Sequence, residues 1–123
     1  MGKEISLRRI SLIAGADLSG SQYKFMALAS DGQIDPCGAG AKSVGVLQDN
    51  PDAAGKVASV GIDGVTKIEL GATLAAGAEV MSNAAGEAVA VTSTNRSQGI
   101  LLEGGVDGDI VPMLLNLNGY ASA

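Results

Sequence analysis

The stretch SVGVLQDNPDAAGKVASV, residues 43–60, has a counterpart later in the chain in SQGILLEGGVDGDIVPML, residues 97–114. Both read Ser-x-Gly, then Val or Ile, then Leu, then a polar loop with acidic residues, then Gly-x-Val or Gly-x-Ile. A chain that repeats such a pattern predicts two halves with the same local structure. Two copies are too few for a solenoid, which needs at least about three repeats, so they favour one closed domain.

The correspondence extends beyond these two stretches. AGADL at residues 14–18 matches LGATL at 70–74, and the same alignment sets Gly20 beside Gly77 and Met26 beside Met81. The offset between the copies is 56 for Gly15 and Gly71 and 53 for Gly55 and Gly108, as a few loop deletions would produce. We therefore interpret the chain as an internal duplication.

The predicted organisation follows from this alignment. One β domain occupies residues 14–117, with pseudo-repeats at 14–60 and 70–114. An N-terminal arm or first strand precedes it at 1–13, and a small polar tail follows at 118–123. At 123 residues the chain has the length of a single domain.

Glycine divides the chain into short apolar runs. The 18 glycines leave no window for a long amphipathic helix, and VTKIEL at residues 65–70 alternates with the period of two expected of a half-buried strand. Asp31-Gly32 and Asp63-Gly64 predict hairpin turns, and Pro112 predicts an edge or a bulge in the last strand. The fold class predicted is all-β: a small β-barrel or sandwich-like domain of two pseudo-repeated halves with an N-terminal arm.

Charge and composition narrow the possible partners. The net charge of −5 argues against nucleic acid, because phosphate binding needs clustered Lys and Arg. No segment approaches the roughly 18 apolar residues of a membrane span, so no membrane partner is expected. The only aromatic residues are Tyr23, Phe25 and Tyr120, too few for a groove that stacks sugars.

Catalytic constellations are missing from the sequence. It contains no His, which excludes triads with an imidazole base and most zinc sites. Cys37 is the single cysteine, so it has neither an intrachain disulfide partner nor an imidazole base. We predict a protein that is not an enzyme, with no catalytic residues and no cofactor.

Two acidic loops come nearest to a metal or ligand site. Calcium needs about six to eight oxygen ligands, and these loops offer several. The same residue types are what ordinary turns require, because their side chains bond to nearby backbone groups. We favour the turn interpretation, predict no metal site, and keep the loop residues as weaker candidates for partner contact: Asp49, Asn50, Asp52, Glu103 and Asp107.

The repeated pattern, "S-x-G-[VI]-L", an acidic polar loop, "G-x-[VI]" and then "G-A-x-L", resembles the small decoration or cement proteins of tailed-phage heads. The resemblance covers about residues 14–117. It implies a compact β-barrel-like domain on the outer face of a capsid, made in the bacterial host cytoplasm. It also implies a homo-oligomer, with a trimer favoured, that bridges neighbouring copies of the major capsid protein and braces the shell.

The resemblance supplies no motif of functional residues, so contact candidates come from the sequence itself. The N-terminal segment can add to a partner as an extra strand, or can simply be the first strand of the barrel. Another self-assembling virion protein and a small metal- or ligand-binding β module remain as alternative functions. The candidates for capsid contact combine basic and apolar side chains: Lys3, Ile5, Leu7, Arg8, Arg9 and Ile10.

Overall fold

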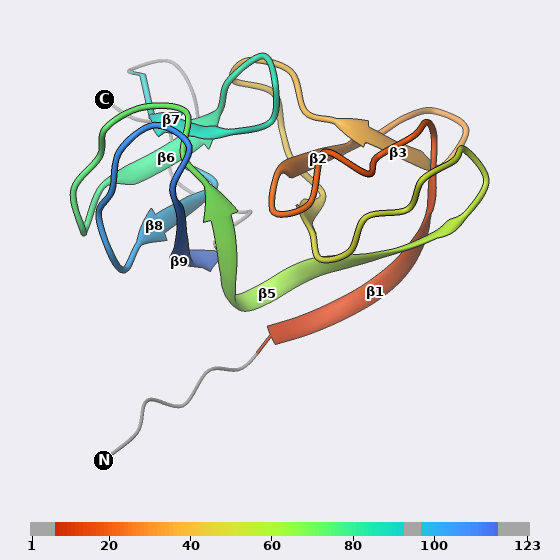
Figure 1. Cartoon of the computed structure of the whole chain (residues 1–123), viewed down its shortest axis with the longest axis horizontal. Coiled ribbons are helices and arrows are strands. Elements are labelled where there is room, and N and C mark those ends of the chain that lie inside the picture. Colours follow the sequence, from red (N-terminus) through yellow and green to blue (C-terminus); the bar gives the residue numbers. More distant parts are fainter. Residues whose placement is uncertain (1–6, 93–96, 116–123) are drawn as a thin grey trace.

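One long strand, β5 (Val57–Glu69), runs through the whole domain and belongs to both of its halves (Figure 1). The computed structural model describes residues 7–92 and 97–115, and every regular element in these ranges is a strand. The first half is formed by β1 (Leu7–Ala14), β2 (Phe25–Leu28), β3 (Gln33–Pro36), β4 (Gly45–Leu47) and the start of β5. The second is formed by the end of β5, β6 (Glu79–Ser82), β7 (Ala88–Ala90), β8 (Gly99–Leu101) and β9 (Ile110–Leu115).

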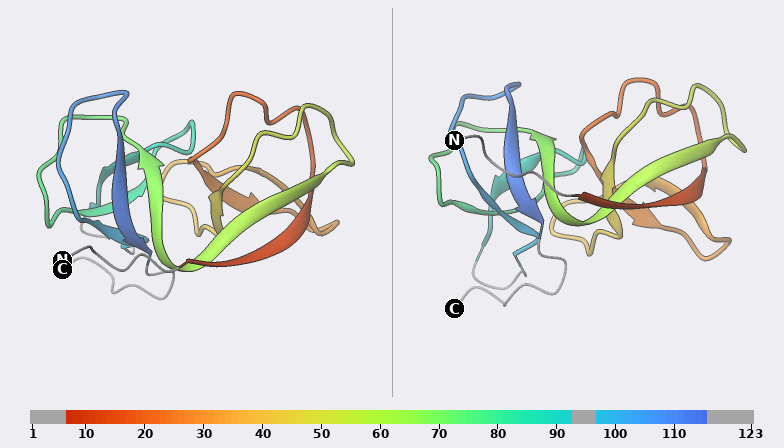
Figure 2. Two further views of the ribbon diagram at one scale, coloured as in Figure 1. Left: turned by 60° about the horizontal axis from the view of Figure 1, so that its bottom comes forward. Right: turned by 90° about the horizontal axis from the view of Figure 1, so that it is seen from below.

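Each half closes into a small ring of strands. In the first, the order β1-β3-β2-β4-β5 returns to its start because β5 also pairs with β1. In the second, the order β5-β9-β8-β6-β7 is closed by a parallel bridge between Leu70 and Ala88. That bridge is the counterpart of the parallel pairing of Ala14 with Ile34 between β1 and β3. The two rings lie side by side and share β5 (Figure 2), which confirms the predicted all-β, barrel-like fold of two similar halves.

The halves repeat one another in their hydrogen bonds as well. The N–H of Tyr23 donates to the carbonyl of Leu47 at 2.8 Å, and the N–H of Gly77 donates to that of Leu101 at 2.7 Å. In the repeated Ser-x-Gly motif, Ser43 Oγ donates to the carbonyl of Gly45 at 2.8 Å. Ser97 Oγ donates to that of Gly99 at 3.1 Å. The repeated residues therefore build repeated local structure.

The glycine of the Ser-x-Gly motif is required by close packing of strands. A Cβ at Gly45 would lie 2.3 Å from the carbonyl oxygen of Gly61 on β5. A Cβ at Gly99 would lie 2.6 Å from Met113 Sδ and 2.8 Å from the carbonyl oxygen of Leu114 on β9. Only a residue without a side chain lets each short strand approach its neighbour so closely.

The interior of the second ring extends into the first half, which also has a core cluster of its own around Met26, Ile34 and Leu47. The larger of the two core clusters joins Phe25, Cys37 and Val46 of the first half to Ile68, Val80 and Met113 of the second. Buried hydrogen bonds also cross the junction, such as Ser43 N–H to Gln98 Oε1 at 3.1 Å and Phe25 N–H to the carbonyl of Gly86 at 2.7 Å. The two halves are therefore joined by buried contacts as well as by β5.

The hairpin predicted at Asp63-Gly64 is wrong, because both residues lie inside β5. Gly64 has a φ of 104°, which redirects the strand as it leaves the first ring and enters the second. A bulge next to this point shifts the register with β1 between Arg8 and Arg9. The Asp31-Gly32 prediction is confirmed, since these residues join β2 to β3 and Gly32 has a φ of 84°.

The edge or bulge predicted at Pro112 is also wrong, because β9 lies between β5 and β8. The carbonyl of Pro112 accepts the N–H of Leu102, just beyond the end of β8, at 3.0 Å. In an antiparallel strand the nitrogen of a residue points to the same side as its carbonyl. The missing donor of Pro112 therefore falls where the β8 ladder stops, and a central strand tolerates it.

Candidate functional site

The N-terminal candidates divide between the arm and the first strand. Lys3 and Ile5 lie outside the described residues. Leu7 begins β1 and is half-buried, whereas Arg8, Arg9 and Ile10 are exposed along the same strand. The described part of the segment is therefore a strand of the domain, paired with β5.

One edge of β1 has no strand partner over most of its length. Its pairing with β5 runs from Leu7 to Ile13, but its pairing with β3 covers Ile13 and Ala14 alone. Ala14 exchanges backbone hydrogen bonds with the β5 side, so by the alternation of a strand the N–H of Ser11 faces the other way. Among the described residues this leaves residues 7–12 open for pairing with an added strand.

The first acidic loop is occupied with turn chemistry. Asp49 Oδ1 accepts the N–H of Ser59 at 3.2 Å. Asp52 forms an ion pair with Lys56, and the hydrogen bond and charge of that lysine hold the pKa of the Asp52 carboxyl below its ordinary value. Asn50 is exposed. These carboxylates serve the fold of their own loop.

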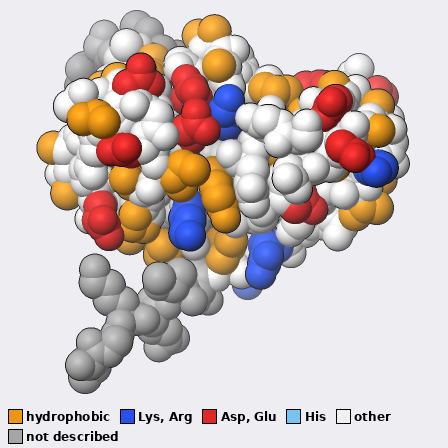
Figure 3. All heavy atoms as spheres, viewed as in Figure 1, with side chains coloured by type: hydrophobic (Ala, Val, Ile, Leu, Met, Phe, Trp, Pro, Cys, Tyr) orange, Lys and Arg blue, Asp and Glu red, His pale blue; other side chains and the backbone are white. Residues whose placement is uncertain are grey.

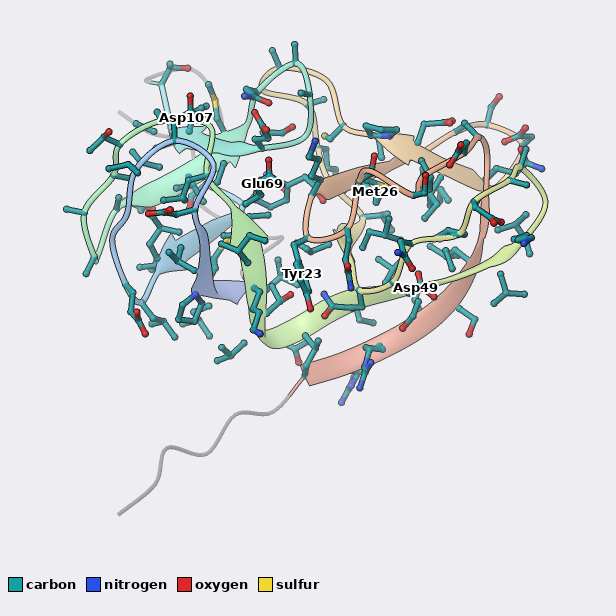
Figure 4. The ribbon with its side chains drawn as sticks, viewed as in Figure 1. Tyr23, Met26, Asp49, Glu69 and Asp107 are labelled. Carbon is teal, nitrogen blue, oxygen red and sulfur yellow. The ribbon has the colours of Figure 1, made fainter. Side chains whose placement is uncertain are left out.

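The second acidic loop lies in the other half of the molecule. Figure 4 shows Asp49 and Asp107 on separate rings, far from one another. Glu103 and Asp107 are both exposed, and Asp109 Oδ2 accepts the N–H of Val106 at 2.9 Å. The structure does not bring the two loops together, and within the described ranges no cluster of three or more acidic, Cys or His residues is placed to hold a metal ion.

A groove lies between the two rings. It has a volume of about 720 Å³ and receives side chains from both halves. Sequence reasoning placed Leu7, Arg9 and Glu103 among the contact candidates but did not place them together. The groove is lined by Leu7, Arg9, Tyr23, Gln48, Val65, Thr66, Lys67, Glu103, Ile110 and Pro112.

Hydrogen bonds fix the inner wall of this groove. Gln48 Nε2 donates to Thr66 Oγ1 at 2.6 Å and to the carbonyl of Val46 at 3.0 Å. Gln22 Nε2 in turn donates to the carbonyl of Gln48 at 2.9 Å. A loop of the first ring is thereby tied to the part of β5 that belongs to the second ring.

Tyr23 stands at the centre of the groove in a strained backbone conformation. Its φ is 65°, and no other residue except glycine has a positive φ in the described part of the chain. The equivalent position in the second half is Gly77, with a φ of 88°. A bulky residue in this region costs on the order of 1–3 kcal/mol, and such strain is often found where a side chain has a task. The Tyr23 ring lies 5.8 Å from Lys67 Nζ (Figure 4).

Next to Tyr23 lies a small group of charged residues. The N–H of Glu69 donates to the carbonyl of Tyr23 at 2.9 Å, and Lys24 Nζ lies 3.9 Å from Glu87 Oε2. Burial, followed by a hydrogen bond with Glu87, raises the pKa of Glu69. A hydrogen bond from Asn83 is the main reason that the pKa of Glu87 is lowered. The pKa values of the two carboxyls are therefore shifted in opposite directions from the ordinary value of glutamate.

Cys37 is fully buried and faces the core rather than a cleft. Its Sγ donates to the carbonyl of Ala41 at 3.3 Å, and burial raises the pKa of the thiol. Both features hold the thiol in its protonated, weakly nucleophilic form.

Hydrophobic and basic side chains lie side by side below the centre of one face, where the two halves meet (Figure 3). Exposed apolar residues near the groove include Ile110, Leu114 and Leu102, which are 49%, 42% and 47% exposed. In the described ranges no helix is long and apolar enough to cross a bilayer. The surface suits contact with another protein better than the enclosure of a small ligand.

Comparison with known proteins adds a fold relationship. The backbone superimposes on the crystal structure of the head fiber gp8.5 N base in bacteriophage phi29 with a TM-score of 0.71 and 16% sequence identity. The match covers 92% of this chain and 98% of that chain. The two chains share a fold. No protein-family model matches the sequence, and no curated protein matches it.

Proposed function

We propose that this protein is a structural component of a tailed-phage head that binds the outer capsid surface and cements neighbouring major capsid subunits. The observation that carries the proposal is the fold shared with the phi29 head fiber base over 92% of the chain. The two halves of the chain and the repeated pattern that resembles phage cement proteins support the same role.

The surface is suited to a cementing function. A protein that braces a lattice needs accessible strand edges and apolar contacts more than a deep catalytic pocket. The open edge of β1 offers backbone donors and acceptors, and Arg8 and Arg9 beside it carry positive charge on an otherwise acidic chain. We propose that this edge is the primary contact with a capsid subunit, that the protein acts without catalysis or cofactor, and that it assembles as a trimer.

Co-sedimentation with capsid shells of the phage that encodes the protein tests this function. We expect saturable binding to mature shells, with a fixed number of copies per shell. Pelleting that never exceeds the level seen without shells would contradict the proposal. Analytical ultracentrifugation of the free protein tests the trimer separately.

The structure also shows which variant to use. Removing residues 1–13 would remove almost all of β1, so loss of binding would then report unfolding. Ser11→Pro instead deletes a single N–H on the open edge and leaves the pairing with β5 intact, and Ser11→Ala keeps that N–H. Loss of binding with Pro but not with Ala supports contact at the β1 edge. Binding that survives in both variants keeps the function and rejects the edge.

A further inference from the structure

The groove between the rings contains a second open strand edge. β5 pairs with β9 along its whole second half, from Gly64 to Glu69. On its other side, the pairing with β1 ends at Gly64, and the next backbone bond is from Glu69 N–H to the carbonyl of Tyr23. Because backbone groups alternate sides along a strand, the N–H groups of Val65 and Lys67 face the groove, as that of Glu69 does. In the part of the chain that the structure describes, no strand pairs with this edge.

The walls of the groove are suited to an extended chain. At about 3.3 Å per residue, the gap between Gly64 and Glu69 accommodates roughly four residues of an added strand. Leu7, Val65, Ile110 and Pro112 supply apolar surface, while Tyr23 and the Gln48–Thr66 hydrogen bond lie on the inner wall. These features match strand addition, in which backbone bonds provide affinity and alternate side chains provide specificity.

Charge specifies the chemistry of the occupant. Lys67 and Arg9 both line the groove and are exposed, and neither has an ion-pair partner among the described residues. Lys67 Nζ also lies 5.8 Å from the centre of the Tyr23 ring, which places its ammonium group beside that part of the groove. Glu103 lies on the same lining but forms no ion pair with either cation in the described ranges. An acidic side chain opposite Lys67 would give its ammonium group an ion-pair partner.

We propose that an extended segment of the capsid subunit, with an acidic residue opposite Lys67 and apolar neighbours, enters this groove as a strand on β5. The inference rests on the proposed function and extends it, because it adds a second contact at the junction of the rings. The strained Tyr23, which has only a glycine as its counterpart, is then a fixed wall that positions the added strand and Lys67 together.

Amide hydrogen exchange of the full-length protein, free and bound to mature shells, tests the groove directly. In the free protein we expect Val65 and Lys67 to exchange faster than Thr66 and Ile68, whose N–H groups point to β9. On shells we expect exchange at Val65 and Lys67 to slow at least about tenfold. We expect Lys67→Glu to weaken shell binding at least about tenfold. Lys42→Glu, a matched charge reversal at an exposed position outside the groove, should change binding by less than about twofold.

Each contrary outcome identifies what has failed. Binding to shells without added protection at Val65 and Lys67 would reject the groove and leave the proposed function standing. Protection of both amides in the free protein would show that the chain fills its own groove, which also rejects the inference. Absence of shell binding would reject the function and the groove together.

Discussion

Comparing Tyr23 with its counterpart in the second half, Gly77, shows what is unusual about this single residue. The hydrogen bonds around Tyr23 and Gly77 are equivalent, and both residues have a positive φ. The second half has a glycine at this position, which adopts a positive φ at no steric cost. The first half has a tyrosine, for which the same φ is sterically unfavourable. The two copies therefore differ at a position where the first half holds a side chain at a steric cost. The sequence alignment, which set Gly77 beside Gly20, did not detect this difference.

Because of this strain, we expect a glycine at position 23 to give a more stable protein than an alanine, the reverse of the usual order. Tyr23→Gly and Tyr23→Ala both remove the ring, so they differ mainly in the cost of the positive φ. We expect the Gly variant to be more stable than the Ala variant by about 1 kcal/mol, measured by urea unfolding, because only glycine adopts this conformation freely. At an ordinary strand or loop position the order is the reverse, so an Ala variant of equal or greater stability would show that the backbone is not strained.

We expect removal of the charge of Glu69 and removal of the charge of Glu87 to have opposite effects on stability. Burial raises the folded-state pKa of Glu69, so its charged form costs stability above that pKa and the cost disappears as pH falls towards the unfolded value. The lowered pKa of Glu87 contributes stability above its ordinary value, which is lost as pH falls through the folded pKa. At pH 7 we expect Glu69→Gln to raise Tm and Glu87→Gln to lower it, each by about 1–3 °C, with both differences shrinking near about pH 4. Shifts of the same sign at pH 7 would contradict this.

At the scale of the strand, the repeated Ser-x-Gly motif is a packing device. Gly45 and Gly99 each allow a three-residue strand to lie against a neighbouring strand at a distance that excludes a side chain. The glycine repeated in the sequence therefore lies, in both halves, where the backbones of two strands are in close contact.

We expect Gly45→Ala and Gly99→Ala to destabilise the domain by about 3 kcal/mol each, because the added methyl group meets a backbone carbonyl that cannot move aside. Gly20→Ala is the matched control, since a Cβ at that position meets nothing within 4 Å and its φ is not positive. Chemical denaturation of the three variants measures the difference. A cost at Gly45 or Gly99 no larger than that at Gly20 would refute the packing explanation.

The sequence predicted the strands better than their connections. The period of two in VTKIEL correctly predicted a half-buried strand, and the structure places Thr66, Ile68 and Leu70 on its buried side. Asp63-Gly64 has the composition of a turn, but β1 and β9 pair with β5 on either side of it and hold it extended. Such long-range pairing is absent from a local pattern, and it overrode local preference.

The candidate site was harder to predict than the fold for the same reason. Arg9 and Glu103 attracted attention as charged residues, but they reach one groove only because β5 joins the two rings. Lys67 was visible in the sequence as the polar position of a half-buried strand, with no sign that it would lie against Tyr23. The groove is formed by segments that are far apart in the sequence and that only the strand topology brings together.

At the scale of the whole molecule, the shared strand and shared core make two similar rings into one cooperative unit. Phe25 and Val46 of the first ring pack in the same cluster as Ile68 and Met113 of the second. Neither ring can close without its part of β5. The architecture offers two similar halves to a lattice without a flexible joint between them.

This arrangement predicts a single unfolding transition. In scanning calorimetry we expect the calorimetric and van't Hoff enthalpies to agree, because the cluster that fills the second ring includes residues of the first and both rings need β5. A fragment of residues 63–123 should remain unfolded, since it lacks Phe25, Cys37 and Val46 of the cluster that fills the second ring. Two resolved transitions, or a folded fragment, would show that the halves are independent domains.

The central claim is that this protein cements the outside of a phage head, and an electron cryomicroscopy difference map between bare and decorated mature shells tests it most directly. We predict added density on the outer surface, in contact with at least two neighbouring major capsid subunits, into which the double-ring domain fits with β1 and the β5 groove facing the shell. A shell without added density, or density that touches a single subunit, would contradict the account.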